Sequence, residues 1–130
     1  MLVGGDGNDS LQGVSGKDLL IGGAGGDTFA RSTGNALSIA GSTAFDLDPA
    51  ALSAILAEWA NPRHSLAQKI ASLQGVNPPA NRLNGSQFLI TSGAAATVFD
   101  DAESDWLNTT ISRDWWLVDL ARDRVSTRKK

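Results

Sequence analysis

Three aspartates recur at one spacing near the start of the chain. Asp9, Asp18 and Asp27 lie nine residues apart, in the consecutive nonapeptides GGDGNDSLQ, GVSGKDLLI and GGAGGDTFA. A glycine-rich backbone can take positive φ and turn tightly, which leaves its carbonyl groups exposed. Carboxylate and carbonyl oxygens are the ligands that Ca²⁺ prefers, about six to eight of them at roughly 2.3–2.6 Å. These residue types at this spacing therefore predict calcium binding in the turns.

The second half of each nonapeptide predicts a short strand that positions the turn. Leu11, Leu20 and Phe29 occupy the eighth place, so each repeat has one inward apolar side chain. A single strand of this length buries too little surface to fold alone, so we expect the strands to stack on a shared core, as in a solenoid. A flexible Gly–Asp linker would not keep apolar residues in register. Met1 to Val3 match the strand half of a repeat whose turn is missing, so we expect upstream repeats of the same polypeptide as a partner.

The block from Gly4 to Ala30 resembles the hemolysin-type (RTX) calcium-binding nonapeptide repeat. The resemblance implies a mainly β fold, a right-handed parallel β-roll or β-solenoid in which repeats i and i+2 stack on the same side. Asp9 and Asp27 would then share one ion, whereas the turn of Asp18 stacks on a turn in which Ala36 replaces the aspartate. The opposite side therefore has a weaker site. The ligand positions implied are Gly4, Gly5, Asp6, Gly7, Asp9, Gly22, Gly23, Ala24, Gly25 and Asp27, with Asp18 as a weaker ligand.

An α-helical hairpin is predicted over residues 46–75, inserted into the solenoid. Asp48-Pro49 is a typical helix start, with Asp as N-cap and Pro at the first position. One apolar face follows at helical spacing, and a second begins near Leu66 and ends before Gly75. The first face consists of Leu52, Ile55, Leu56 and Trp59. We expect this face to be buried against strands.

The nine-residue period returns after the insert without most of its glycines. Its eighth place holds Leu89, Val98, Leu107, Trp116 and Val125, and its sixth place holds Gln87, Ala96, Asp105, Asp114 and Asp123. We therefore predict four segments, which are RTX repeats in 1–39, the helical insert in 40–81, degenerate solenoid strands in 82–126, and a frayed basic tail in 127–130. Asp105 and Asp123 are candidates for a weaker metal site.

An acidic cluster spans residues 100–105. Asp101, Glu103 and Asp105 have the spacing of the start of an EF-hand loop, but Trp106 stands where that loop requires glycine. This excludes an EF-hand. A weaker calcium site and a solvated turn both remain open for the cluster.

No catalytic residues are predicted, and we expect the chain not to be an enzyme. His64 is the only histidine and there is no cysteine, so a catalytic triad or a zinc site has almost nothing to use. We expect His64 to be a solvated residue in the first turn of the second helix. Trp115 and Trp116 fall on opposite faces of a strand, so Trp116 belongs to the core. Trp115 either packs under the helices or forms a sugar-stacking platform.

Charge and composition exclude further classes. The net charge of −3 in 130 residues is too small to imply a nucleic-acid partner, and no apolar run has membrane-spanning length. The stretches IAGSTAFD, ALSAILAEW, TVFDD and SRDWW resemble a segment that follows such repeats in large bacterial secreted or surface proteins, which implies a secreted or cell-surface location. The predicted function is a calcium-binding structural module at the C-terminal end of such a protein, with folding coupled to calcium. The alternatives are a carbohydrate- or surface-binding module that uses Trp115, and the non-catalytic tail of an exported hydrolase.

Overall fold

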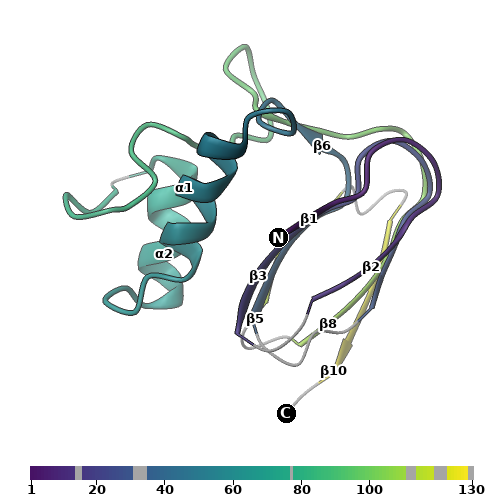
Figure 1. Cartoon of the computed structure of the whole chain (residues 1–130), viewed down its shortest axis with the longest axis horizontal. Helices are drawn as coiled ribbons and strands as arrows, with labels where there is room; N and C mark the ends of the chain where they lie inside the picture. Colours follow the sequence, from purple (N-terminus) through teal and green to yellow (C-terminus); the bar gives the residue numbers. More distant parts are fainter. Residues whose placement is uncertain (14–15, 31–34, 77, 111–113, 119–122, 129–130) are drawn as a thin grey trace.

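The computed structural model describes residues 1–13, 16–30, 35–76, 78–110, 114–118 and 123–128. Two parallel sheets of four strands each face one another, and two helices lie outside them (Figure 1). The first sheet has the order β1 (Leu2–Val3), β3 (Lys17–Ile21), β5 (Asn35–Ile39) and β9 (Trp115–Leu117). The second has the order β10 (Arg124–Arg128), β8 (Trp106–Thr110), β4 (Thr28–Ala30) and β2 (Ser10–Gln12). These parallel sheets confirm the prediction of a mainly β chain.

Strands that follow one another in the N-terminal repeats alternate between the two sheets. Each strand therefore pairs with the strand two repeats later, as in the registers Leu2↔Leu20 and Ser10↔Thr28. This pairing confirms that repeats i and i+2 stack. Side chains alternate across each strand, so one face of the first sheet packs between the sheets and the other packs against the helices.

The two tryptophans of β9 lie on opposite faces. Trp116 packs with the cluster between the sheets, which contains Leu11, Leu20, Phe29 and Leu107. Trp115 packs with the outer cluster of Leu19, Ile21, Leu37, Ile39 and apolar residues of the helices. The prediction for Trp116 is confirmed, and Trp115 takes the packing role rather than lying open as a platform.

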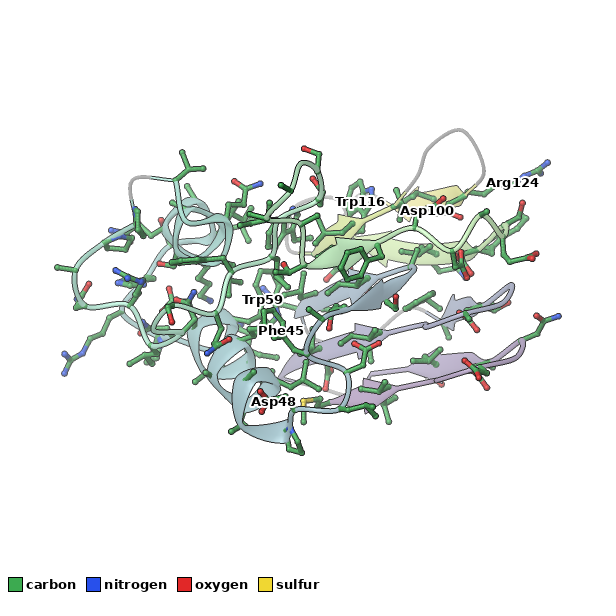
Figure 2. All side chains as sticks on the ribbon, turned by 90° about the horizontal axis from the view of Figure 1, so that it is seen from above. Phe45, Asp48, Trp59, Asp100, Trp116 and Arg124 are labelled. Carbon is green, nitrogen blue, oxygen red and sulfur yellow. The ribbon has the colours of Figure 1, made fainter. Side chains whose placement is uncertain are left out.

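The helices α1 (Pro49–Trp59) and α2 (Leu66–Gln74) cover the outer face of the first sheet (Figures 1 and 2). Asp48 caps α1 and accepts a hydrogen bond from the Ala51 N–H at 3.2 Å. Ser65 and Gln68 form a capping box on α2, and Gly75 ends it in the left-handed conformation at φ +72°. The predicted α1 face is buried, with Leu52, Ile55 and Trp59 almost fully enclosed. Among the described residues, no helix is both long and apolar enough to cross a membrane.

The segment of residues 82–97 differs from the predicted solenoid strands, because it contains no strand of either parallel sheet. Leu89 packs against the helices instead, and its N–H donates to the Leu73 carbonyl at 2.6 Å. Asn84, fully buried, donates to the carbonyls of Ser72 and Gln87. Val98 lies in β7 (Val98–Phe99), antiparallel to β6 (Ser42–Thr43). Leu89 is thus buried against the helices rather than between the two parallel sheets.

Parallel stacking resumes at Trp106. Strand β8 pairs with β4 in the register Phe29↔Leu107, and β9 pairs with β5 in the register Leu37↔Trp115. The predicted core positions Leu107 and Trp116 are therefore in the sheets. The inserted helices leave the stack of strands continuous.

The prediction that His64 is a solvated residue in the first turn of the second helix is wrong, because His64 is buried and precedes α2. Its Nδ1 contacts Glu58 Oε2 at 2.5 Å, and its Nε2 lies 2.9 Å from Asn81 Oδ1. Hydrogen bonds with Glu58 and Asn81 raise the pKa of His64. Burial pushes the pKa of Glu58 up, but hydrogen bonds from His64, the Leu83 N–H and Asn61 outweigh it and hold that pKa below its ordinary value. The two residues therefore form a buried ion pair at the end of α1.

This pair predicts a dependence of stability on pH. A raised folded-state pKa of His64 contributes stability that is complete below its unfolded value of about 6.5 and is lost as the pH rises through the folded value. The lowered pKa of Glu58 contributes stability above about 4.5 that is lost as the pH falls through its folded value. We expect the free energy of unfolding in urea to fall with rising pH in the unchanged chain more than in His64→Gln. The difference between the two chains at each pH isolates His64, because the other titrating groups are common to both. Parallel curves of unfolding free energy from pH 6 to 9 would contradict the ion pair.

Candidate metal centre

Four aspartates form a ladder along one edge of the second sheet. Asp9, Asp27, Asp105 and Asp123 each stand immediately before the first residue of a strand, and these strands are stacked side by side. The Asp9 N–H donates to Asp27 Oδ1 at 2.8 Å. The Asp27 N–H donates to Asp105 Oδ1 at 2.6 Å, and the Asp105 N–H to Asp123 Oδ1 at 3.0 Å. One carboxylate oxygen of Asp27, Asp105 and Asp123 therefore accepts a backbone hydrogen bond, which fixes the position of each carboxylate.

The second oxygens of the ladder are left without hydrogen bonds. Oδ2 of Asp9, Asp27 and Asp105 is buried in each case and has no hydrogen-bond partner. A buried charged oxygen without a partner is costly, so such atoms call for a ligand or a proton. The ladder thus offers unsatisfied anionic oxygens at successive levels of the stack.

The two N-terminal turns on this side lie directly on one another. Asp6 and Ala24 form a parallel bridge, and the Ala24 N–H donates to the Gly5 carbonyl at 3.1 Å. A Cβ at Gly4 would lie 2.5 Å from the Gly22 carbonyl oxygen and 2.7 Å from Asp9 Oδ2. Four glycines of these turns take positive φ, namely Gly5, Gly7, Gly23 and Gly25. Only glycine fits this close backbone approach, and the resulting cradle of carbonyl and carboxylate oxygens fits the donor set of Ca²⁺.

Burial and mutual repulsion raise the pKa values of two carboxylates in the ladder. Burial raises the pKa of Asp27 to about 6; the hydrogen bond from the Asp9 N–H lowers it, and the charges of Asp9 and Asp101 raise it. Burial likewise raises the pKa of Asp105 to about 7, and the charges of Asp123, Asp101 and Asp27 act in the same direction. A divalent cation among these groups would relieve both effects, because it favours the ionised form.

The opposite side, at the starts of β3 and β5 in the first sheet, brings together fewer predicted ligands. Asp18 is buried, and its Oδ2 has no hydrogen-bond partner. The Ala36 N–H donates to Asp114 Oδ1 at 2.8 Å, so a later carboxylate approaches the turn that has lost its own. Asp114 occupies a repeat position in the sequence, but the sequence does not indicate it as a neighbour of Ala36. Residues 14–15 and 31–34 of these turns lie outside the described residues.

Asp101 lies beside the ladder, which the sequence did not indicate. One carboxylate oxygen each from Asp27, Asp101 and Asp105 lies within 4.8 Å of the others. The acidic run of residues 100–105 was the available signal, but it did not identify Asp27 as the partner. Asp105 and Asp123, predicted as weaker ligands, are both buried in the ladder.

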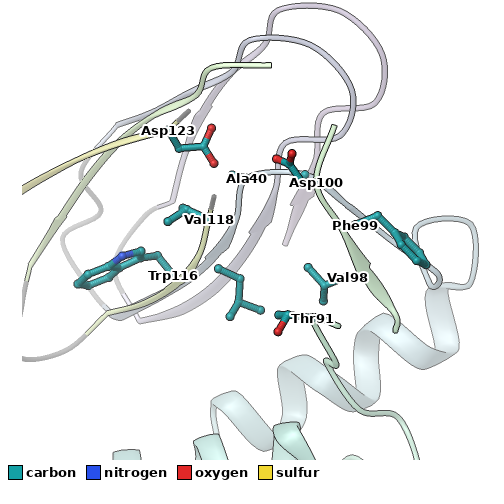
Figure 3. Close-up of a pocket in the computed structure, with 10 residues that line it drawn as sticks. Ala40, Thr91, Val98, Phe99, Asp100, Trp116, Val118 and Asp123 are labelled. Carbon is teal, nitrogen blue, oxygen red and sulfur yellow. The ribbon is translucent and has the colours of Figure 1, made fainter. Parts of the chain in front are cut away.

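A pocket of about 480 Å³ opens beside the end of β5, between β7 and β9 (Figure 3). Trp116 and Val118 line one side and Val98 the other, with Asp100 and Asp123 at one end. The tryptophan in this pocket is Trp116, whereas Trp115 packs in the outer cluster.

The N-terminal turns match a known family of repeats. The family model of the RTX calcium-binding nonapeptide repeat matches residues 1–35, in 4 copies. No curated protein and no solved structure matches the chain. The match covers the stacked glycine turns and stops before the helices. Residues 1–35 thus carry the RTX calcium-binding nonapeptide repeat, whose ligand is Ca²⁺.

Proposed function

We propose that the chain is a calcium-stabilised structural module in which the turns Gly4–Asp9 and Gly22–Asp27 hold an ion between them. The observation that carries this proposal is the pair of buried, unpartnered Oδ2 atoms of Asp9 and Asp27 within the matched repeats. Ca²⁺ bound there would neutralise the two carboxylates and tie consecutive coils together. The two facing parallel sheets would then form a right-handed β-roll, with the helical hairpin packed on its outer face.

The residues of the two turns supply two kinds of oxygen ligand in this proposal. Asp9 and Asp27 supply anionic oxygens, and the backbone hydrogen bond from Asp9 orients the carboxylate of Asp27. The glycines at positions 4, 5, 7, 22, 23 and 25, together with Asp6 and Ala24, supply closely spaced carbonyl groups. Asp18 is a weaker ligand on the opposite side. The module holds an ion for stability, and the proposal includes no catalytic step.

The proposal places the module in a secreted or cell-surface protein, at the C-terminal side of further repeats. Extracellular calcium modules bind with dissociation constants of about 10⁻⁴–10⁻³ M, which couples their folding to export. The edge of β1 supports upstream repeats as neighbours, because Leu2 and Val3 are exposed there. Glycan binding through Trp115 has less support, since that side chain packs in the outer cluster.

The two sides of the roll should differ in affinity. We expect Asp27→Ala to remove the tightest calcium binding and Asp18→Ala to change the total little, because only the Asp27 side stacks two aspartates. Ala36→Asp should strengthen or create binding on the Asp18 side. Isothermal titration of the three variants measures this. Equal loss of high-affinity calcium in Asp18→Ala and Asp27→Ala would overturn the proposed pairing of ligands.

A further inference from the structure

The turn of residues 100–105 stacks on the turn Gly22–Asp27 and is the third turn on that side, after Gly4–Asp9 and Gly22–Asp27. Asp101 Oδ2 accepts from the Gly25 N–H at 2.8 Å, and Asp105 Oδ1 accepts from the Asp27 N–H at 2.6 Å. The Trp106 N–H donates to the Asp27 carbonyl at 2.9 Å. This turn contains no glycine and lies outside the matched residues 1–35. Three backbone hydrogen bonds nevertheless bring its two aspartates against the repeat block.

The carboxylates that meet here are enclosed and incompletely satisfied. Asp27 is 1% exposed and Asp105 is 2% exposed, and Oδ2 of each is buried without a hydrogen-bond partner. Asp101 is half-buried, and its Oδ1 accepts from the Glu103 N–H at 3.1 Å. The charges that raise the pKa of Asp105 come from carboxylates. The arrangement concentrates negative charge around buried free oxygens.

We propose that Asp27, Asp101 and Asp105 form a second calcium site, which fastens the segment returning from the helices to the last RTX repeat. Their oxygens lie within 4.8 Å of one another. Three oxygens within 4.8 Å of one another have a common point no more than about 2.8 Å from each, so small side-chain rotations bring all three to the Ca²⁺–oxygen distance of roughly 2.3–2.6 Å. Three carboxylates, with no imidazole or thiolate among the grouped ligands, suit a hard divalent cation such as Ca²⁺.

This second site would have a distinct structural role. Asp105 directly precedes β8 and Asp101 lies in the same turn, so an ion shared with Asp27 would hold β8 beside β4 after the chain has passed through the helices. The inference rests on the proposed function in that it invokes the same kind of ion and shares Asp27, but two of its ligands, Asp101 and Asp105, lie outside the repeats. The site between Asp9 and Asp27 can therefore succeed or fail separately.

The test is the stoichiometry and affinity of calcium binding by the full chain, measured by equilibrium dialysis and titration calorimetry. Asp101→Asn keeps an oxygen that can accept from Gly25 but removes the charge, and it should cost one bound calcium or weaken one site at least tenfold. Glu103→Gln removes the same charge from the same turn and is the matched control, with binding unchanged. Asp9→Asn should weaken the other site and leave this one. Circular dichroism in calcium checks that each variant is folded.

Hydrogen exchange supplies a second readout. Calcium should slow exchange of the Trp106 and Leu107 amides in the unchanged chain and in Glu103→Gln, and should do so much less in Asp101→Asn. Wild-type stoichiometry and affinity in Asp101→Asn would overturn the second site and leave the repeat site standing. Loss in Asp101→Asn, with full binding in Asp9→Asn, would support the second site and overturn the ligand pair proposed for the repeats. A chain that binds no calcium would overturn both.

Discussion

We expect the chain to melt about 10 °C lower in EDTA than in excess calcium. A ligand that binds only the folded state at 100 times its dissociation constant stabilises it by about 2.7 kcal/mol. For a chain of this size, 1 kcal/mol corresponds to roughly 3–5 °C in melting temperature. Without the ion, buried carboxylates such as Asp27 and Asp105 also repel one another. Circular dichroism melting curves in EDTA, in calcium and in magnesium measure the effect.

Asp27→Ala is the control for this prediction, because that residue belongs to both proposed sites. Its melting temperature should depend on calcium much less than that of the unchanged chain. An exposed substitution, Leu47→Ala, should keep the full calcium shift, since Leu47 is 99% exposed. Superimposable curves for the unchanged chain in EDTA and in saturating calcium would be incompatible with folding coupled to calcium.

Trp59→Ala should lower the free energy of unfolding by about 3–5 kcal/mol, as for other buried large-to-small substitutions. Trp59 is 1% exposed and lies between α1 and the outer face of the first sheet (Figure 2). Its indole N–H donates to the Asn35 carbonyl at 3.2 Å, and the Lys69 ammonium lies 5.7 Å from its ring centroid. Truncation would leave a cavity and remove both contacts. Urea unfolding in saturating calcium provides the measurement.

Two further variants separate the causes of this loss. Trp59→Phe keeps most of the apolar surface but not the hydrogen bond, so its loss should be intermediate. Leu47→Ala should change stability by no more than about 0.5 kcal/mol, as is usual for exposed positions. A loss for Trp59→Ala in that same small range would mean that the helices are not bound to the sheet in solution.

The local regularities of the sequence accounted for the repeats and the helices. Apolar residues such as Leu11 and Phe29 recur with the period that strands and turns require, and the strands lie where that period places them. Asp48 before Pro49 and Gly75 after the second apolar face marked helix ends, because caps are satisfied by neighbouring residues in the chain. Each of these features depends on interactions within a few residues.

Only the tertiary structure decided which distant groups meet. Leu89 and Leu107 share one position in the nine-residue pattern, yet Leu89 packs on α2 and Leu107 between the sheets. An apolar side chain can be buried by a helix as well as by a strand, so periodicity could not distinguish them. Nothing in the sequence around His64 indicates Glu58 as a buried partner, so the sequence alone predicts a solvated residue there.

The same reason applies to the metal centre. The glycine turns and their aspartates are adjacent in sequence, so the repeat itself indicated the cradle of Asp9 and Asp27. Asp105 reaches Asp27 across 78 residues, and Asp101 meets Gly25 across 76. No local pattern records these contacts, since they exist only because the chain leaves the stack at the helices and returns to it in register.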